Sequence, residues 1–396
     1  MTIWFIEPRD PLIVRDGRPF DASPGAQATS LSFPFPSTTT GGVRTRAGLD
    51  DDGIFDKSKT ELVKTIKVRG PLLVQLTKDE TDIDPGKWLV PAPADAIILG
   101  EKVTCKQLVP LQPFEGSQTD FDQNNTGKLA LVGMVETDLR KPTKEVPQYW
   151  YWDKFQKWLI KPSDLSSQKE LDTSTLGHNG PQREHRIHVS IEPDKGIAKE
   201  GALFGTSGIE FTYTGIGKEK HIDAFRPLAL AVAVEENGEF SLREGLTGFG
   251  GERRIVRWRK SNSDLPRCPK EIVEAIIKDR ACRVHLLTPA CFMQGYRPKW
   301  LIDQESECKP TLKAIATQRP QVVSGWDLEH RKPKPTRRLA PAGSVFFLLL
   351  DGSDKSVRNW IKQLWMQCIS DEEIDRNDGF GLAVLGIWSG KPEQME

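Results

Sequence analysis

Short apolar runs bounded by Pro, Gly and Asp recur along the first half of the chain. Runs of this length between turn residues are typical of β-strands. We expect strands at Ile3–Ile6, Ile66–Leu76, Lys87–Val90, Phe211–Tyr213 and Leu228–Val234. A helix is predicted over Thr38–Leu49, because Ser37 follows an extended Phe-Pro repeat and can cap a helix.

The second half alternates strand-like and helix-like patterns. We expect a helix at Pro269–Asp279, strands at Arg283–Thr288 and Val345–Leu350, a helix at Val357–Ile369 and a closing strand at Leu382–Trp388. This alternation with an antiparallel closing strand indicates a split βαβ unit. The predicted fold class is α+β, with two tandem ferredoxin-like (RRM-like) domains that carry insertions and glycine-rich loops.

A Gly-Phe-Gly sequence occurs at residues 248–250 and again at 379–381. Each copy leads into a β-like run that ends at Trp258 or Trp388, and each follows an apolar strand pattern. A set repeated at about half the chain length predicts two related domains in tandem. Glycine lets the backbone approach a ligand closely, so both turns are candidates for ligand contact. A plain structural turn is the alternative.

Residues 113–200 differ from their surroundings and are interpreted as an insertion. They are polar and loop-rich, and they carry an aromatic cluster between Tyr149 and Trp158. Ser261–Pro269, with Ser, Asn, Asp and two prolines, is the best linker candidate. The predicted domains are therefore residues 1–262, with the insertion at about 113–200, and residues 263–396.

Composition excludes several classes of protein. Lys plus Arg and Asp plus Glu number 55 each, so a nucleic-acid surface must be segregated on one face. The six cysteines include no Cys-x-x-Cys pair, which indicates reduced thiols in the cytoplasm rather than a zinc or redox site. There is no signal-peptide pattern, and no window approaches the ~20 apolar residues of a membrane helix. We expect a cytoplasmic protein without a cofactor.

The first glycine turn is followed by a row of basic residues. Its candidate RNA-binding residues are Gly248, Gly250, Gly251, Arg253, Arg254, Arg257 and Arg259. On a strand, Arg253, Arg257 and Arg259 would share one face, and guanidinium groups bind phosphate in a bidentate fork. The alternative is a solvated strand face.

Other basic residues extend this set. Arg44 and Arg46 follow Gly41-Gly42 in the first predicted helix, where two glycines cost about 1 kcal/mol each relative to alanine and indicate close packing or close ligand approach. Arg337 and Arg338 end a basic, proline-rich run that begins at Arg331. Arg15 and Arg18, in an N-terminal turn, complete the candidates.

No catalytic or metal site is predicted. His178, His185 and His188 lie in one stretch, and His185 and His188 with Glu184 and Glu192 are a weak metal alternative. A histidine acting as general base in RNA cleavage is a second alternative. The sequence joins no nucleophile, base and orienting group, so we expect no enzyme.

Three N-terminal motifs and the glycine turns carry a family resemblance. Glu7–Leu12, Arg15–Phe20 and Phe33–Thr39 resemble the N-terminus of the third subunits of the Cmr complex, the type III-B CRISPR effector. These subunits belong to the repeat-associated mysterious protein (RAMP) superfamily, whose glycine-rich loops the two Gly-Phe-Gly turns resemble. Leu287–Ala290 and Phe292–Trp300 also fit. The resemblance covers essentially the whole chain and is least clear over 113–200.

The resemblance implies a role in antiviral defence as part of a ribonucleoprotein. It implies tandem ferredoxin-like domains, binding of the 5′ tag of the CRISPR RNA, and docking on the large polymerase/cyclase-like subunit and on the backbone RAMP subunit. Some relatives process precursor CRISPR RNA with a histidine. A non-catalytic RNA-binding subunit is therefore expected, and a metal-independent endoribonuclease and a purely structural adaptor stay open.

Overall fold

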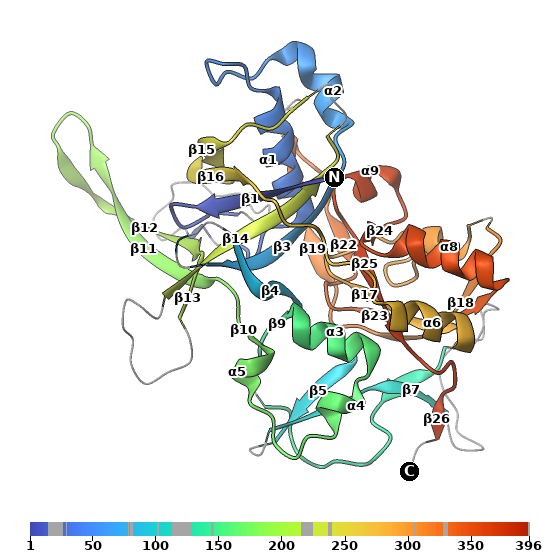
Figure 1. Ribbon diagram of the computed structural model, residues 1–396. Helices are drawn as coiled ribbons and strands as arrows, with labels where there is room; N and C mark the ends of the chain where they lie inside the picture. The colour runs from blue at the N-terminus through green and yellow to red at the C-terminus, as the bar shows by residue number, and fades with distance from the viewer. Residues whose placement is uncertain are drawn as a thin grey trace. The chain divides into compact units, whose positions relative to one another are not determined.

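The computed structural model describes the chain except residues 15–26, 29, 78, 80–81, 101–102, 113–128, 144–145, 215–224, 237–239, 305, 328–331 and 395–396. The chain divides into two compact units (Figure 1). The first contains Met1–Ile83, Gly180–Ser263 and Val322–Arg337, and the second contains the remainder. One boundary between the units, at Ser263, falls inside the predicted linker. Residues 84–179, which the sequence places in the N-terminal domain, lie in the second unit together with residues 264–321 and 338–396.

The first unit is built on an antiparallel sheet. In sheet order its strands are β3 (Val68–Leu76), β14 (Phe225–Val234), β1 (Thr2–Pro8), β16 (Arg254–Lys260) and β15 (Gly245–Phe249) (Figure 1). The short β13 (Thr212–Thr214) also pairs with β14. β1 lies between β14 and β16, and five consecutive residues from Ile3 are buried. Burial on both faces explains its unbroken apolar sequence.

Helix α1 (Pro36–Gly48) lies between β1 and β3 in the chain. Its N-cap is Phe35, with no side-chain hydrogen bond, so the prediction that Ser37 caps this helix was wrong. Proline at the first helical position has a suitable φ and lacks the N–H group that a cap would satisfy. A 3₁₀ turn, η1 (Lys57–Lys59), and α2 (Thr60–Lys64) follow.

A long antiparallel ribbon belongs to the first unit. It consists of β11 (Gln182–Glu192) and β12 (Ile197–Glu210), and β2 (Gln27–Ala28) pairs in parallel with β12 (Figure 1). The prediction of a loop-rich segment was wrong over Gln182–Glu192. The outer part of this ribbon has no buried face, so its sequence lacks the apolar alternation that marks a strand. The basic, proline-rich run that ends at Arg338 and the residues before it hold short strands, β19 (Gln321–Val323), β20 (Trp326–Asp327), β21 (Lys332–Pro333) and β22 (Arg337–Leu339).

The second unit contains a second antiparallel sheet. In sheet order its strands are β18 (Lys309–Ala316), β23 (Val345–Asp351), β17 (Ala281–Leu286), β25 (Leu382–Ile387) and β24 (Gln367–Cys368). Its helices are α6 (Lys270–Asp279), α7 (Lys299–Ile302), α8 (Asp354–Leu364) and α9 (Glu373–Asn377). α8 ends before the predicted Ile369, because Met366 takes a left-handed φ of 55° and β24 follows.

Residues 84–179 complete the second unit with short elements. These are β4 (Ile83–Pro91), β5 (Ala96–Leu99), β6 (Thr104–Gln107), β7 (Val109–Gln112), β8 (Leu131–Gly133), β9 (Tyr149–Tyr151), α3 (Trp152–Ile160), α4 (Ser163–Ser166), α5 (Thr173–Leu176) and β10 (Gly177–His178), with β26 (Glu393–Gln394) pairing with β7. The aromatic cluster forms β9 and α3, and Trp150, Phe155 and Trp158 are at most 1% exposed. These rings are core rather than part of a polar insertion.

A buried ion pair joins this segment to the second sheet. Arg283 on β17 and Asp95 are both fully buried, with Nη1 and Oδ2 2.6 Å apart. Asp95 also accepts from Trp158 Nε1 at 2.9 Å, and Arg283 donates to the carbonyls of Trp158, Leu159 and Ile387. The pair is well satisfied, which offsets the desolvation of both charges.

The two sheets share one strand order. Numbering four strands of each unit along the chain, both read second, third, first, fourth: β3-β14-β1-β16 and β18-β23-β17-β25. A helix, α1, follows the first strand in one unit, and a helix, α8, follows the third strand in the other. The predicted mixture of helices and antiparallel sheets is confirmed. In the described residues, no helix is both long and apolar enough to cross a membrane.

Candidate nucleic-acid interface

The first glycine turn closes a β-hairpin. Gly248 and Phe249 belong to β15, and residues 250–253 turn the chain into β16. Gly250, Glu252 and Arg253 have φ values of 67°, 56° and 50°. The prediction that Arg253 lies on the strand face was therefore wrong: this residue is exposed at the tip of the hairpin.

The glycines in this turn approach the protein's own backbone. Gly251 N donates to the carbonyl of Ile13 at 2.7 Å, and a Cβ added at Gly250 would lie 2.8 Å from the same oxygen. A Cβ at Gly248 would lie 3.0 Å from the Cβ of Arg253. The close approach that the sequence predicted is thus used within the fold, where it fixes the hairpin against the residues after β1.

Phe249, between the glycines, packs on the first helix. Its ring would lie 2.5 Å from a Cβ at Gly42 of α1, and its centroid is 6.5 Å from that of Trp258. Gly42 is therefore required for close packing. A Cβ at Gly41 would meet no described atom within 4 Å, so the same reason does not apply to it.

The second glycine turn is held in a similar way. Gly379 and Gly381 have φ values of 94° and 82°, and Phe380 is fully buried. Gly381 N donates to the carbonyl of Pro289 at 2.8 Å, and Thr288 Oγ1 donates to the carbonyl of Gly379 at 2.7 Å. Both turns therefore bury a phenylalanine and fix a glycine one or two residues after it by a hydrogen bond to a neighbouring segment.

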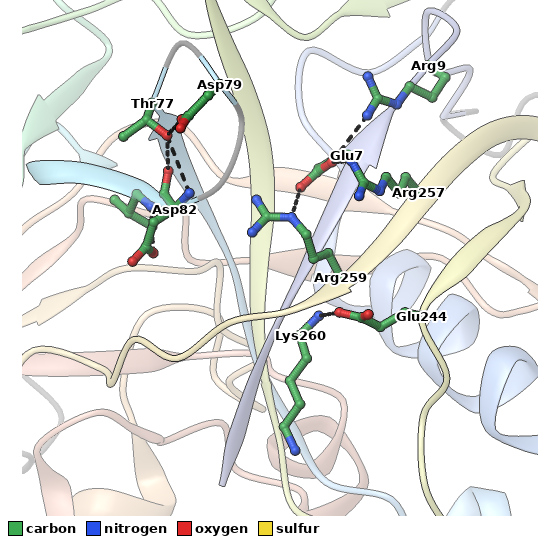
Figure 2. A network of polar contacts seen from close by, with 10 residues as sticks. Glu7, Arg9, Thr77, Asp79, Asp82, Glu244, Arg257, Arg259 and Lys260 are labelled. Atoms are coloured by element: carbon green, nitrogen blue, oxygen red, sulfur yellow. Dashed lines mark hydrogen bonds and ion pairs between the residues drawn. The ribbon is translucent and has the colours of Figure 1, made fainter.

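Arginines gather on the face of β1 and β16 that carries Phe5 and Glu7. Arg257 and Arg259 lie opposite Glu7 and Phe5 in the strand register, so these side chains share one face. Figure 2 shows Glu7 between Arg9, Arg257 and Arg259. The Glu7 carboxylate accepts from Arg259 Nε at 2.7 Å, and its second oxygen lies 3.5 Å from Arg9 Nη2 and 3.8 Å from Arg257 Nη1.

The arginines of this face differ in exposure. The side chain of Arg259 is only 14% exposed and also lies over the Phe5 ring, whereas Arg9 and Arg257 are 38% and 44% exposed. Three guanidinium groups thus surround the Glu7 carboxylate, and those of Arg9 and Arg257 are the more exposed. Arg254 points to the other face of β16 and pairs with Glu252 at 2.8 Å.

The remaining predicted arginines have mixed surroundings. Arg46 donates to the carbonyls of Arg243 and Glu244, and burial together with the charge of Arg243 lowers its pKa. Arg44 donates to the carbonyl of Ile66 at 3.2 Å. Both guanidinium groups thus support the fold around α1.

Two further pairs of predicted arginines lie elsewhere. Arg337 and Arg338 lie on β22, the first half-buried and the second exposed. Arg15 and Arg18 fall outside the described residues. The structure therefore brings together Arg253, Arg254, Arg257 and Arg259 with the glycine turn, but not all on one face.

Sequence reasoning placed Ile255 on the face of Arg257 but missed Arg9 and a second apolar neighbour of Arg257, Leu246. Leu246 is opposite Arg257 in the register of β15 and β16, and Ile255 is two residues earlier on the same face. They are 64% and 40% exposed. The alternation of Ile255, Arg257 and Arg259 was visible in the sequence, but Leu246 and Arg9 join it only through the pairing of the strands.

The histidines do not form a common site. His178 belongs to the second unit, where it is buried beside Tyr151. Burial and, to a smaller extent, the charge of Lys87 lower the pKa of His178 to about 4. His185 and His188 are three residues apart on β11 and face opposite sides of the ribbon. His188 stacks on Phe204 and lies 2.9 Å from Thr206 Oγ1. Within the described ranges, no group of three metal-ligating side chains occurs.

Comparisons with known proteins indicate the family. Among solved structures, similar chains occur in a type III-B Cmr-beta complex bound to cognate target RNA and AMPPnP (14% identity, covering 91% of this chain and 88% of that chain, TM-score 0.43) and in the same type of complex bound to cognate target RNA (15%, 87% and 86%, 0.44). A chain of a Csm3-Csm4 subcomplex of the type III-A complex is also similar (10%, 87% and 92%, 0.30). These likenesses are distant.

No curated protein matches the chain. The family model for the CRISPR-associated protein Cas_Cmr3 matches residues 4–388, from the first strand to the end of the last strand of the second sheet. This confirms the family expected from the N-terminal motifs. The chain belongs to the Cas_Cmr3 family of CRISPR-associated proteins.

Proposed function

We propose that this chain is a non-catalytic RNA-binding subunit of a type III-B CRISPR effector ribonucleoprotein in the cytoplasm. In this role it holds the 5′ tag of the CRISPR RNA through the β15–β16 hairpin and the adjoining end of β1. It docks on the large polymerase/cyclase-like subunit and on the backbone RAMP subunit. The family supports the complex, and the exposed guanidinium groups of Arg9 and Arg257 are the observation that carries the RNA contact.

The charge distribution supports an RNA surface on this face. The chain has no net charge, so an electrostatic attraction to RNA needs a local excess of positive charge. Arg9, Arg253 and Arg257 supply that excess within one hairpin and the residue after β1. Because Arg259 and the glycines make buried contacts within the fold, we infer that they shape this surface rather than bind RNA directly. Arg254 lies at its edge.

The strand order of the two sheets supports a specific fold for each unit. We interpret each unit as a divergent ferredoxin-like domain, because both sheets have the strand order of a split βαβ unit. Each sheet has a full-length helix at one of its two crossovers: α1 in the first and α8 in the second. The other RNA contacts proposed from the sequence, at Arg15, Arg18, Arg44, Arg46, Arg337 and Arg338, are secondary to the hairpin.

Crosslinking tests the RNA contact. The complex assembled with photoreactive CRISPR RNA should crosslink to the β15–β16 hairpin at nucleotides of the 5′ tag. A complex that assembles without any crosslink between this chain and the CRISPR RNA would instead support a purely structural adaptor.

Incubation with repeat RNA tests the absence of catalysis. The isolated chain, with and without divalent metal, should leave the RNA intact, because the described histidines are buried or divided between the faces of the ribbon. Specific cleavage that disappears on His185→Ala or His188→Ala would contradict this and support the endoribonuclease.

A further inference from the structure

The three arginines around Glu7 hold its carboxylate unequally. Oε1 accepts a hydrogen bond from Arg259 Nε at 2.7 Å, and Glu7 itself is only 5% exposed. Oε2 lies 3.5 Å from Arg9 and 3.8 Å from Arg257, and among the described residues it accepts no hydrogen bond. Arg259 therefore fixes Glu7, while Arg9 and Arg257 are attracted to it without the short geometry of a bidentate pair.

Arg9 and Arg257 have the geometry of a site for a second oxyanion. Both lie within 4 Å of the same carboxylate oxygen, at 3.5 Å and 3.8 Å, so their guanidinium groups are close together (Figure 2). Glu7 cancels only part of their charge. A tetrahedral phosphate between them would receive the short N–H···O contacts that Glu7 does not make, and guanidinium groups favour such a ligand.

Exposed apolar side chains border this pair. Leu246 lies directly opposite Arg257, and Ile255 is joined to Arg9 by a hydrogen bond from Arg9 N to its carbonyl at 2.9 Å. Their exposed fractions, 64% and 40%, are large for aliphatic residues of a sheet. Apolar groups beside guanidinium groups match a nucleotide, whose sugar and base present apolar surface next to a phosphate.

We propose that Arg9 and Arg257 bind one backbone phosphate of single-stranded RNA, that Leu246 and Ile255 contact its nucleoside, and that Glu7 attenuates the affinity of this subsite. The proposal rests on the RNA-binding function proposed above and assigns it to one nucleotide position. Glu7 prevents repulsion between Arg9, Arg257 and Arg259 before RNA binds. It also weakens the attraction for phosphate, because a carboxylate beside a phosphate is a like-charge pair.

Fluorescence anisotropy of the full chain with a short labelled single-stranded RNA tests the subsite. Arg257→Gln should weaken binding and reduce the log–log salt slope by about 0.7, the value for one phosphate contact to a single strand. Leu246→Ser should weaken binding without changing the slope. Glu7→Gln keeps an acceptor for Arg259 and should tighten binding about fivefold, the order given by unit charges ~4 Å apart in water.

Matched controls separate this subsite from general charge effects and from misfolding. Arg358→Gln removes the same charge from an exposed position of α8 and should change neither affinity nor slope. Arg9→Gln should reproduce Arg257→Gln and serves if the latter unfolds. Inorganic phosphate at constant ionic strength should compete with RNA in the wild type and lose this effect in Arg257→Gln.

The outcomes distinguish the subsite from the wider function. If the wild type binds RNA with the expected salt dependence while Arg9→Gln, Arg257→Gln and Glu7→Gln all behave as wild type, the subsite is refuted and the RNA-binding function stands. Weaker binding by Glu7→Gln would refute attenuation. If Leu246→Ser has no effect, the nucleoside contact is refuted. Absence of RNA binding by the wild type, alone and in the assembled complex, would refute both proposals.

Discussion

Alanine at Gly42 should destabilise the first unit, whereas alanine at the neighbouring Gly41 should stabilise it. A Cβ at Gly42 would lie 2.5 Å and 2.7 Å from two ring carbons of Phe249, about 1 Å inside ordinary carbon contact. The ring is 3% exposed and packs on Trp258, so it has little room to move. Apart from its chain neighbours and the backbone of its own helix, a Cβ at Gly41 would lie more than 4 Å from every atom of the described residues.

The magnitude follows from two opposing terms. Both substitutions gain about 1 kcal/mol of helix propensity, because alanine replaces glycine inside a helix. Overpacking costs about 1–3 kcal/mol and applies only at Gly42. Gly41→Ala should therefore raise the free energy of unfolding by about 1 kcal/mol, whereas Gly42→Ala should lower it by up to about 2 kcal/mol, so the two variants differ by about 1–3 kcal/mol. For domains of this size, 1 kcal/mol corresponds to about 2–4 °C in Tm.

Urea unfolding monitored by tryptophan fluorescence measures both variants, since Trp4 and Trp258 are buried in this unit. The two should differ in midpoint with similar m-values. RNA binding adds a second readout, because displacement of Phe249 shifts the glycine turn in Gly42→Ala only. Equal midpoints for the two variants would refute the packing of Phe249 on α1 as the reason for glycine at this position.

Three further predictions concern the turn and the second unit. Gly250→Val should disrupt folding, because its Cβ would lie 2.8 Å from the Ile13 carbonyl, and loss of RNA binding with an unchanged unfolding midpoint would contradict this. Arg283→Met should cost about 3–5 kcal/mol in urea unfolding by leaving Asp95 buried without its partner, and a loss under 1 kcal/mol would show that water reaches the site. Burial lowers the pKa of His285 to about 3; the charge of Arg283 also lowers it, and that of Asp95 opposes the shift. Because the unfolded chain binds this proton near pH 6.5 and the folded chain does not, the free energy of unfolding should fall by about 1.4 kcal/mol per pH unit as the pH decreases from about 6.5 towards 3. His285→Leu should flatten that dependence, and an unchanged pH profile would place the histidine outside the acid transition.

Apolar runs were sufficient to predict six strands of the two sheets. β1, β3, β14, β17, β23 and β25 overlap the predicted runs, because their residues are buried and therefore apolar. β15 was missed, since Gly245–Phe249 contains two glycines and takes its form from pairing with β16. The outer part of the β11–β12 ribbon was missed because its apolar residues are exposed, so no core imposed a pattern on them.

The site was predictable only in part for a similar reason. The arginines after Gly248 are visible as a cluster, but a strand pattern begun one residue too early placed Arg253 on the face of Arg257. Arg9 lies far from that cluster in the sequence and reaches it through the pairing of β1 with β16. The role of the glycines also depends on tertiary structure, because Ile13 and Phe249 occupy the space that the missing side chains leave.

The proposed contact between the β15–β16 hairpin and the 5′ tag can be tested by a nucleotide-resolution crosslink map of this chain on the CRISPR RNA in the assembled complex. We expect crosslinks from the 5′ tag to Leu246, to residues 253–257 and to the segment around Arg9. Arg257→Gln should weaken these crosslinks, and Arg358→Gln should not. Crosslinks of the tag confined to other surfaces of this chain, with the β15–β16 hairpin unlabelled, would contradict the proposed contact.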